Sequence, residues 1–429
     1  MPATAPATSE NSMQLVEQMR DATLRGALRD ASPQVAQILE RALEARETDF
    51  HDALTLAHLA RTGGVDLIAM LKTADELRRR AVGEAITYVV NRNLNFTNIC
   101  FVGCAFCGFS RGPNSPDAYF HGNEAMIAKT RQAVELGATE ICIQGGLPRD
   151  LDPFYYRDLL RDIKAAVPQI HIHAFSPMEI VYGVGKTGMA LREYLQMLKE
   201  AGLGSIPGTA AEILDDRVRE ELSPNKLKVE QWIEVVRTAH SLGIASTSTM
   251  MYGHTEQPED WVRHILLLRR IQKETHGFTE FVPLGFIHSN TRLFHIGGAR
   301  PGSTIAEHLG VHALSRILLD LTIRNLQVSW VKLGFEMSLA CLDAGANDFS
   351  GTLMEESISK AAGANFGEYV EPAQFRSLIR SISRIPAERT TTYQIRQTFP
   401  VKDPAEPHLP APGVASVRSF QPSVSGTGY

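Results

Sequence analysis

The stretch Cys100-Phe-Val-Gly-Cys104-Ala-Phe-Cys107 places three thiols within eight residues, in the spacing C-x3-C-x2-C. It follows the β-rich run Ala85-Ile-Thr-Tyr-Val-Val90, so it lies just beyond the first predicted strand. Three neighbouring thiols cannot all pair with one another, and the other two cysteines, Cys142 and Cys341, are isolated. The arrangement therefore favours a metal or cluster site in a reducing compartment over a disulfide framework. We expect Cys142 and Cys341 to be small buried hydrophobic residues.

The composition is that of an ordinary globular protein. Of 429 residues, 44% are hydrophobic and 21% are charged, which excludes wholesale disorder. The formal net charge is −5, which argues against a chain whose main task is to bind nucleic-acid backbones. No stretch approaches the roughly 20 apolar residues needed to cross a bilayer, and no secretory signal is visible. We therefore expect a cytoplasmic protein with neither a nucleic acid nor a membrane as partner.

Helices and strands alternate along most of the chain. Residues 13–82 show an amphipathic helical pattern, and residues 83–395 alternate between short apolar strands and helices. No G-x-G-x-x-G follows a strand, so we predict an α/β fold in the form of a (β/α) TIM-like barrel with an N-terminal helical extension and C-terminal helices. Residues 1–12 and 396–429 are expected to be disordered. The expected strands are 85–90, 140–143, 170–175, 204–207, 244–251, 278–284 and 328–332.

The thiol cluster fits an iron–sulfur site better than a structural zinc site. A structural zinc ion needs a fourth ligand, which a second pair of ligands usually supplies. The nearest candidate, His121, lies 14 residues after Cys107 and has no partner. Three thiolates on a four-iron cubane leave one iron open to a chelating ligand, as a catalytic cluster requires. The alternatives are a structural zinc site, a buried cysteine group and a non-enzymatic electron carrier, whose cluster is usually fully ligated.

The C-x3-C-x2-C spacing, the aromatic Phe106 before the last cysteine and the barrel-like alternation together resemble the radical S-adenosylmethionine (SAM) superfamily. This resemblance implies a 4Fe–4S cluster held by Cys100, Cys104 and Cys107, whose open iron chelates SAM. It also implies reductive cleavage of SAM to a 5′-deoxyadenosyl radical, and hence an electron donor as a partner.

Two further features are expected to contact SAM. Gln144-Gly145-Gly146 follows the strand 140–143, and by the resemblance this turn faces the methionine amino group; the alternative is an ordinary Gly-Gly turn. Glu212 follows the extended run 204–207, and by analogy it contacts the SAM ribose. The alternative for Glu212 is an acidic residue at a helix N-terminus.

The resemblance narrows further along the chain. Residues 173–179, 207–214 and 248–256 are similar to the enzymes that build deazaflavins and futalosine-pathway menaquinone, and residues 278–284 and 345–356 are especially similar to the FO synthase branch of CofH type. That branch implies transfer of the 4-hydroxybenzyl group of L-tyrosine to 5-amino-6-(D-ribitylamino)uracil in deazaflavin (FO, coenzyme F420) biosynthesis. A separate radical SAM subunit would then close the ring. Aminofutalosine synthase and dehypoxanthine futalosine cyclase are the sibling alternatives.

Polar residues near strand ends are the candidates for binding these substrates, because barrel chemistry gathers at the carboxyl ends of the strands. Each has a structural alternative: a hydrogen-bonded core histidine, a helix cap before Pro258, or ordinary turn chemistry after Gly345. The candidates are His173, Tyr252, His254, Glu256, Asn347 and Asp348.

Overall fold

The computed structural model describes residues 9–404 and 406. Its N-terminal part consists of helices, as predicted, but the first helix already begins at Ser9, so residues 9–12 are helical rather than disordered. Residues 1–8 and 407–429, also expected to be disordered, lie outside the described residues. The helices of this extension are α1 (Ser9–Asp21), α2 (Leu24–Asp30), α3 (Pro33–Leu43), α4 (Phe50–Thr62) and α5 (Gly64–Val82).

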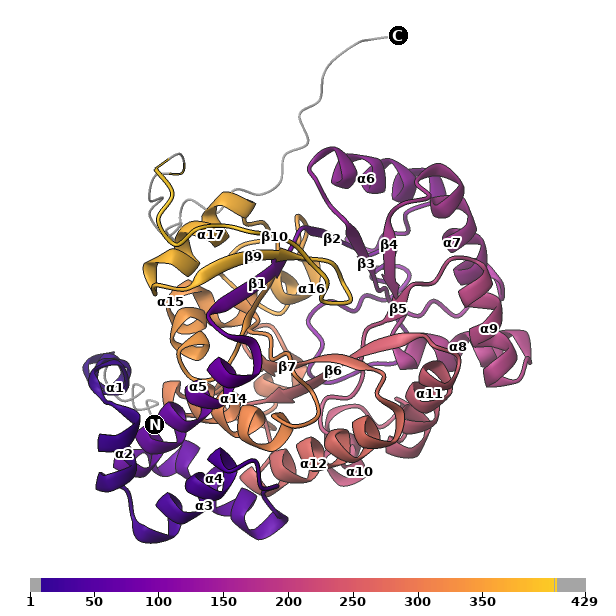
Figure 1. Ribbon diagram of the computed structural model, residues 1–429. Helices are drawn as coiled ribbons and strands as arrows, with labels where there is room; N and C mark the ends of the chain where they lie inside the picture. The colour runs from indigo at the N-terminus through magenta and orange to yellow at the C-terminus, as the bar shows by residue number, and fades with distance from the viewer. Residues whose placement is uncertain (1–8, 405, 407–429) are drawn as a thin grey trace.

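Two sheets follow the extension. The larger is a parallel sheet of six strands in the order β2-β3-β4-β5-β6-β7, and the smaller has the order β10-β9-β1-β8. Helices line the outside of the larger sheet, as the strand-helix alternation predicts (Figure 1). The strands are β1 (Ala85–Val89), β2 (Asn91–Leu94), β3 (Glu140–Ile143), β4 (His171–Ala174), β5 (Ser205–Ile206), β6 (Ala245–Tyr252), β7 (Phe278–Gly285), β8 (Asp348–Gly351), β9 (Ile385–Arg389) and β10 (Ile395–Thr398).

The helices that connect these strands carry an apolar face toward the sheets. In α7, for example, Tyr156, Leu159, Leu160 and Ile163 are buried, at the spacing of one helix face. The connecting helices are α6 (Asn123–Glu135), α7 (Tyr155–Ala166), α8 (Pro177–Thr187), α9 (Leu191–Glu200), α10 (Asp216–Leu222), α11 (Val229–Ser241), α12 (Pro258–Thr275), α13 (Arg292–His295), α14 (Ile305–Leu319), α15 (Trp330–Leu342), α16 (Ser357–Ala361) and α17 (Pro372–Ser381).

The predicted first strand belongs to the smaller sheet, and a second strand that follows it directly belongs to the larger sheet. β1 pairs in parallel with β8 and with β9, whereas β2, which begins two residues after β1 ends, pairs with β3. The cysteine loop therefore follows β2 rather than the apolar run 85–90. A single extended segment thus joins the small sheet to the large one.

A short extended segment, residues 325–328, closes the barrel between β7 and β8. Phe281 and Leu326 form a parallel bridge, as do Gln327 and Asp348. Phe281 N donates to Asn325 O (2.9 Å), and Val328 N donates to Asp348 O (2.9 Å). With these links the strands surround a lumen, which confirms the TIM-like barrel.

Two sequence predictions fail in this part of the chain. The strand expected at 328–332 is wrong, because helix α15 begins at Trp330. The start of that helix is buried and apolar, and the periodicity of such a short run does not distinguish a helix from a strand. The segment from 385 onward was expected to hold helices and then a disordered tail. It instead forms the antiparallel hairpin β9–β10, which pairs through β9 with β1.

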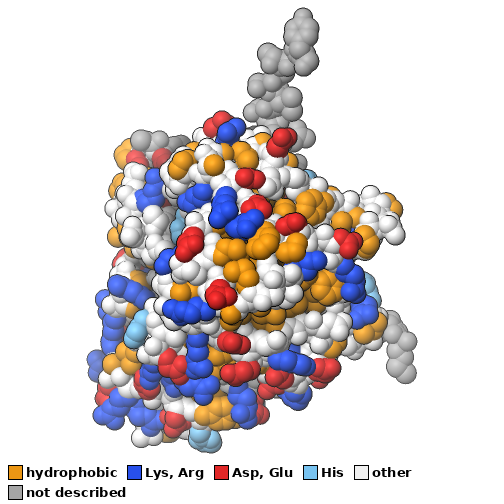
Figure 2. All heavy atoms as spheres, turned by 90° about the vertical axis from the view of Figure 1, so that its right-hand side faces the viewer, with side chains coloured by type: hydrophobic (Ala, Val, Ile, Leu, Met, Phe, Trp, Pro, Cys, Tyr) orange, Lys and Arg blue, Asp and Glu red, His pale blue; other side chains and the backbone are white. Residues whose placement is uncertain are grey.

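The lengths of the helices and the charges on the surface bear on whether the chain could bind a membrane or a nucleic acid. Among the described residues no single helix is long and apolar enough to span a membrane; α4 and α5 pass that test only as a pair, which is bent by 117°. On the face shown in Figure 2, acidic and basic side chains are interspersed, so that face has no broad basic surface of the kind that binds a nucleic-acid backbone.

A matched pair of glycines tests how the extension docks on the barrel. Gly310 in α14 lies against α4, where an added Cβ would meet Ala60 Cβ at 2.5 Å and Ala60 Cα at 2.8 Å; at Gly185 in α8 nothing lies within 4 Å. We expect Gly310→Ala to lower the free energy of unfolding by about 1–3 kcal/mol through overpacking. Gly185→Ala should raise it by about 0.5–1 kcal/mol, because alanine favours a helix. Chemical denaturation measures both, and equal shifts would contradict this docking.

Candidate active site

Two adjoining cavities occupy the barrel. The cluster cavity, of about 270 Å³, lies at the carboxyl ends of the strands and is lined by the three motif cysteines. The inner cavity, of about 250 Å³, lies deeper in the lumen and is lined by residues such as Asn91, Glu140 and His173. The two cavities share part of their lining, so they adjoin. The shared residues are Gln144, Thr209, Thr249, Leu284, Lys332 and Ile358.

The motif cysteines lie in the loop between β2 and α6, and all three line the cluster cavity. Backbone hydrogen bonds hold this loop: Cys100 N donates to Arg111 O (3.0 Å), and Ala105 N donates to Leu222 O (2.8 Å) at the end of α10. Burial raises the pKa of Cys104 to about 12, although nearby Lys226 acts in the opposite direction. This thiol is therefore protonated unless a metal ion displaces its proton.

The donor set suits an iron–sulfur cluster. Among the described residues no group of three or more His, Cys, Asp or Glu side chains is already arranged to hold a metal ion. Three thiols from one loop nevertheless face one cavity, and none of the five cysteines is in a disulfide. Soft thiolates in that number match a cluster with one open iron better than they match a zinc ion.

Gly145 and Gly146 line the cluster cavity, and their lack of a side chain has a local structural cause. A Cβ on Gly145 would meet Phe96 Cε1 at 2.4 Å, and one on Gly146 would meet Ile99 O at 2.2 Å. Gly146 N also donates to Thr97 O (2.8 Å). The glycines thus let the end of β3 pack directly against the start of the cysteine loop, while Gln144 lines both cavities.

Glu212 lies in a buried charge cluster on the wall of the cluster cavity. Its backbone has φ of 42°, a left-handed conformation that turns the chain after β5. Its carboxylate accepts from Lys226 Nζ (2.7 Å) and Arg219 Nη1 (3.3 Å). Burial acts to raise the pKa of Glu212, but the two cations outweigh it and the pKa is lowered. Glu212 is therefore ionised and faces the cavity from a fixed position.

Glu179 is a second carboxyl group on that wall, and the sequence analysis passed over it. It caps α8 by accepting from Ser176 N (2.7 Å) and Ser176 Oγ (2.6 Å), and it also accepts from Gly145 N (3.0 Å). Burial raises its pKa to about 7 despite these hydrogen bonds. Glu179 thus ties the Gly-Gly turn to α8, and the S-x-x-E pattern of a capping box is the signal that identifies it.

The inner cavity is lined by polar side chains at alternate positions of the strands. Asn91, Asn93 and Asn95 face it from β2 and the loop that follows, and Glu140, Cys142 and Gln144 face it from β3 and its end. Side chains two residues apart share one face of a strand, so this alternation explains the polar lining. Cys142, expected to be a buried hydrophobic residue, instead lines this cavity; Cys341 is buried as expected.

His173 is the predicted substrate residue that reaches the inner cavity. Its Nδ1 shares a hydrogen bond with Ser205 Oγ (2.7 Å), and His171 Nε2 contacts the same hydroxyl (2.8 Å). Burial lowers the pKa of His173 to about 4, although Glu140 acts to raise it. His173 is therefore a neutral imidazole held in one orientation beside the cavity.

The β9–β10 hairpin closes the amino-terminal end of the lumen. Arg389 and Thr391 line the inner cavity, and Arg389 Nη2 donates to Asp348 Oδ1 (2.9 Å). Tyr393 donates to Glu280, which lies near the start of β7. Burial raises the pKa of Glu280. Arg389, Thr391 and Tyr393 lie in a region where no strand was expected, so the sequence analysis missed them.

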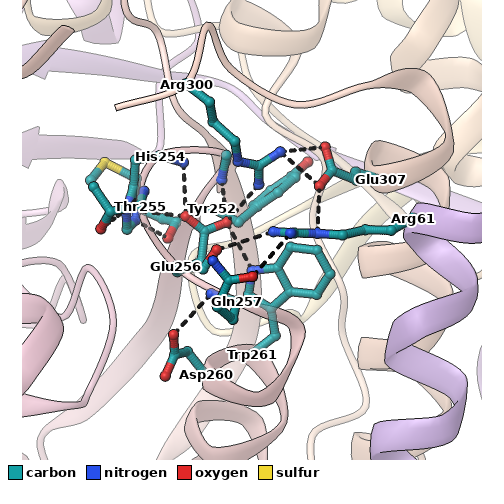
Figure 3. Close-up of polar contacts among 12 residues, drawn as sticks. Arg61, Tyr252, His254, Thr255, Glu256, Gln257, Asp260, Trp261, Arg300 and Glu307 are labelled. Carbon is teal, nitrogen blue, oxygen red and sulfur yellow. Dashed lines mark hydrogen bonds and ion pairs between the residues drawn. The ribbon is translucent and has the colours of Figure 1, made fainter. Parts of the chain in front are cut away.

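Three predicted substrate residues lie in a buried network outside both cavities (Figure 3). Glu256 accepts from Gly253 N (2.6 Å), His254 N (2.8 Å) and Trp261 Nε1 (3.0 Å), and Arg300 Nη2 donates to the same carboxylate (3.0 Å). Tyr252 OH instead bonds His308 Nδ1 (2.7 Å). The structure thus gives Tyr252, His254 and Glu256 partners within the protein.

This network also reaches the N-terminal extension. Arg61 of α4 donates to Gln257 Oε1 (3.1 Å) and to Glu256 O (3.1 Å), and its Nε lies 3.3 Å from a Glu307 carboxylate oxygen. Arg300 makes two 2.7 Å hydrogen bonds to the same Glu307 carboxylate. The loop after β6 is therefore anchored to both α4 and α14.

Asn347 and Asp348 also line neither cavity. Asn347 Oδ1 accepts from Arg316 Nη2 (2.8 Å) and Leu326 N (2.8 Å), which holds the closing segment in place. Asp348 is fully buried and pairs with Arg389. Through these contacts both residues help to hold the barrel closed.

Comparison with known proteins places this barrel in a family. The model of the radical SAM superfamily matches residues 94–268, and the model of the CofH/MqnC C-terminal region matches residues 275–401. Among solved structures, the FeFe-hydrogenase maturase HydG from Carboxydothermus hydrogenoformans has a TM-score of 0.65 at 15% identity, covering 90% of this chain and 86% of that one. Methylornithine synthase has a TM-score of 0.57 at 17% identity, covering 74% and 86%. These structures show the fold.

Sequence relatives are much closer. The 5-amino-6-(D-ribitylamino)uracil–L-tyrosine 4-hydroxyphenyl transferase of Methanothermobacter thermautotrophicus is 48% identical over 83% of this chain and 96% of its own length. The FO synthase of Mycobacterium leprae is 51% identical over 79% of this chain, but the match spans only 39% of that protein. The chain therefore belongs to the radical SAM superfamily and, within it, to the family of these 4-hydroxyphenyl transferases and FO synthases.

Proposed function

We propose that the chain is a radical SAM transferase that joins the 4-hydroxybenzyl group of L-tyrosine to 5-amino-6-(D-ribitylamino)uracil in deazaflavin biosynthesis. The observation that carries this proposal is the 48% identity to the Methanothermobacter transferase over 96% of that protein's length. A match of that extent includes most of the residues that line the two cavities. The two adjoining cavities also suit a reaction that brings two substrates together near a cofactor.

The cofactors of this superfamily are a 4Fe–4S cluster and SAM, and we propose that Cys100, Cys104 and Cys107 hold the cluster. When bound, the cluster and SAM supply the 5′-deoxyadenosyl radical that starts the reaction by abstracting hydrogen. We place SAM against Gln144, Gly145, Gly146 and Glu212, because these residues line the same cavity as the cysteines.

The residues of the chain then have two tasks in the proposed reaction. Polar side chains of the inner cavity bind the uracil ring and the hydroxylated ribityl tail through amide, carboxylate and imidazole groups, as in Asn91, Glu140 and His173. The hairpin that carries Arg389 closes the far end of the lumen and keeps water away from reactive species. Tyr252, His254, Glu256, Asn347 and Asp348 support these walls from behind through the contacts described above.

The proposal includes further components. The Methanothermobacter transferase is matched over nearly its whole length, whereas more than half of the Mycobacterium leprae FO synthase lies outside the match. We also propose a second radical SAM component that closes the ring of the product. An electron donor is also needed for SAM cleavage, and thiolate ligands of an iron–sulfur cluster need a reducing compartment, so we propose a cytoplasmic location.

Replacement of a motif cysteine tests the proposed ligands. We expect Cys104→Ser to lose most of the iron and sulfide that the wild-type protein binds on anaerobic reconstitution, together with the charge-transfer absorption of the cluster, because serine is a poor ligand for this cluster. Cys341→Ala is the matched control and should keep both. Circular dichroism should show a folded barrel in each variant. Full cluster loading of the Cys104→Ser variant would refute the assignment.

Substrate choice tests the proposed reaction. The reconstituted protein with SAM and a reductant should release 5′-deoxyadenosine and form the coupled product only when both L-tyrosine and 5-amino-6-(D-ribitylamino)uracil are present. Mass spectrometry with ring-labelled tyrosine identifies the transferred fragment. Turnover only with an aminofutalosine-type or dehypoxanthine futalosine-type substrate would reassign the chain to a sibling activity. Absence of 5′-deoxyadenosine with every substrate would contradict an enzymatic function.

A further inference from the structure

Lys332 is unusual among the cationic side chains of the lumen. Lys226, Lys332 and Arg389 are the lysines and arginines that line the two cavities. Lys226 is paired with Glu212 (2.7 Å), and Arg389 is paired with Asp348. Among the described residues Lys332 has no carboxylate oxygen within 4.0 Å of its Nζ; its hydrogen-bond partner is the neutral Ser359 Oγ, at 3.0 Å. A buried ammonium group without an anionic partner is costly unless a ligand supplies one.

The position of Lys332 suits a ligand that extends between the two cavities. Lys332 lines both of them, and it keeps accessible surface although it lies deep in the protein. Burial lowers the pKa of Lys332, and the nearby Glu356 acts in the opposite direction. The Glu356 carboxylate is engaged by Asn93 Nδ2 (2.5 Å) and Ser359 N (2.8 Å). The two donors of the ammonium group that Ser359 does not use can therefore bind an incoming anion.

The surroundings also indicate the kind of anion. Leu284 and Ile358 line the same junction and offer apolar surface for a ring, next to a cation for a carboxylate. In the proposed reaction, the carboxylate of SAM is bound at the open iron by family resemblance, and the diaminouracil carries no carboxylate. The free carboxylate that reaches this junction is then that of the amino-acid substrate.

We propose that Lys332 binds the α-carboxylate of L-tyrosine and holds the amino acid between the cluster cavity and the inner cavity. This inference rests on the proposed function and names a residue for substrate recognition at the same site. Lys332 fixes one end of the amino acid, so that its Cα and amino group face the cluster cavity and its ring lies against the apolar wall. The hydrogen bond to Ser359 fixes the lysine side chain in turn.

The test compares tyrosine with tyramine, which has the same ring and amine but no carboxylate. Binding is measured by calorimetry on the anaerobically reconstituted protein with SAM and without reductant, so that no turnover occurs. Wild-type protein should bind tyrosine more tightly than tyramine. Lys332→Met should weaken tyrosine binding by about 10- to 100-fold, the usual range for losing a hydrogen bond to a charged group, and leave tyramine binding unchanged. Lys332→Arg should retain a large part of the preference.

A matched control and the contrary outcomes make the test decisive. Lys360→Met removes an exposed lysine of the neighbouring helix α16, paired with Glu368 at the surface, and should change neither affinity. Unchanged tyrosine binding in Lys332→Met would overturn the inference, as would an equal loss for both ligands or a loss confined to the diaminouracil. Wild-type protein that binds no tyrosine at all would instead refute the proposed function, and the inference with it; cluster content and circular dichroism confirm that each variant is folded.

Discussion

The extended segment at residues 85–94 is the constraint on which the rest of the barrel depends. Its first half pairs with β8 and β9, and its second half pairs with β3, so one register must satisfy three neighbours. Val89, Asn91 and Asn93 point into the lumen because they alternate along this segment. A slip of one residue would turn these side chains outward and bring Val90 and Arg92 inside, so the inner cavity would lose its amide lining.

The same register brings the carboxyl ends of two parallel strands, β2 and β3, together at the site. The cysteine loop begins where β2 ends, and the Gly-Gly turn packs against it from the end of the neighbouring β3. Close backbone contact between these two strand ends therefore positions the motif cysteines. On the opposite wall, the buried network around Glu256 holds the loop after β6 in place. There Arg300 and Arg61 connect this loop to the helical extension.

Much of the fold could be predicted from the sequence because strands and amphipathic helices alternate along it at regular spacing. The cysteine spacing indicated the chemistry for the same reason: it is a local pattern. Predictions failed where long-range contacts decide the outcome, as at residues 328–332, where a buried helix start has the composition of a strand. The partners of Glu256, namely Arg300 and Trp261, are also not visible in the sequence, and the structure is needed to identify them. The alternation Asn91, Asn93, Asn95 was a usable local signal for the lumen.

Two stretches of the chain, which match two different family models, supply the wall of the lumen. The C-terminal hairpin belongs to the second stretch. Residues 94–268, which match the superfamily model, supply most of the residues around the cysteines. Residues 275–401 supply Glu280, Lys332 and Arg389 to the lining of the inner cavity. Substitutions in the second stretch can thus alter the wall of the lumen while the residues around the cysteines stay the same. Descendants of a common ancestor can in this way acquire new substrates without having to reinvent the means of activating them.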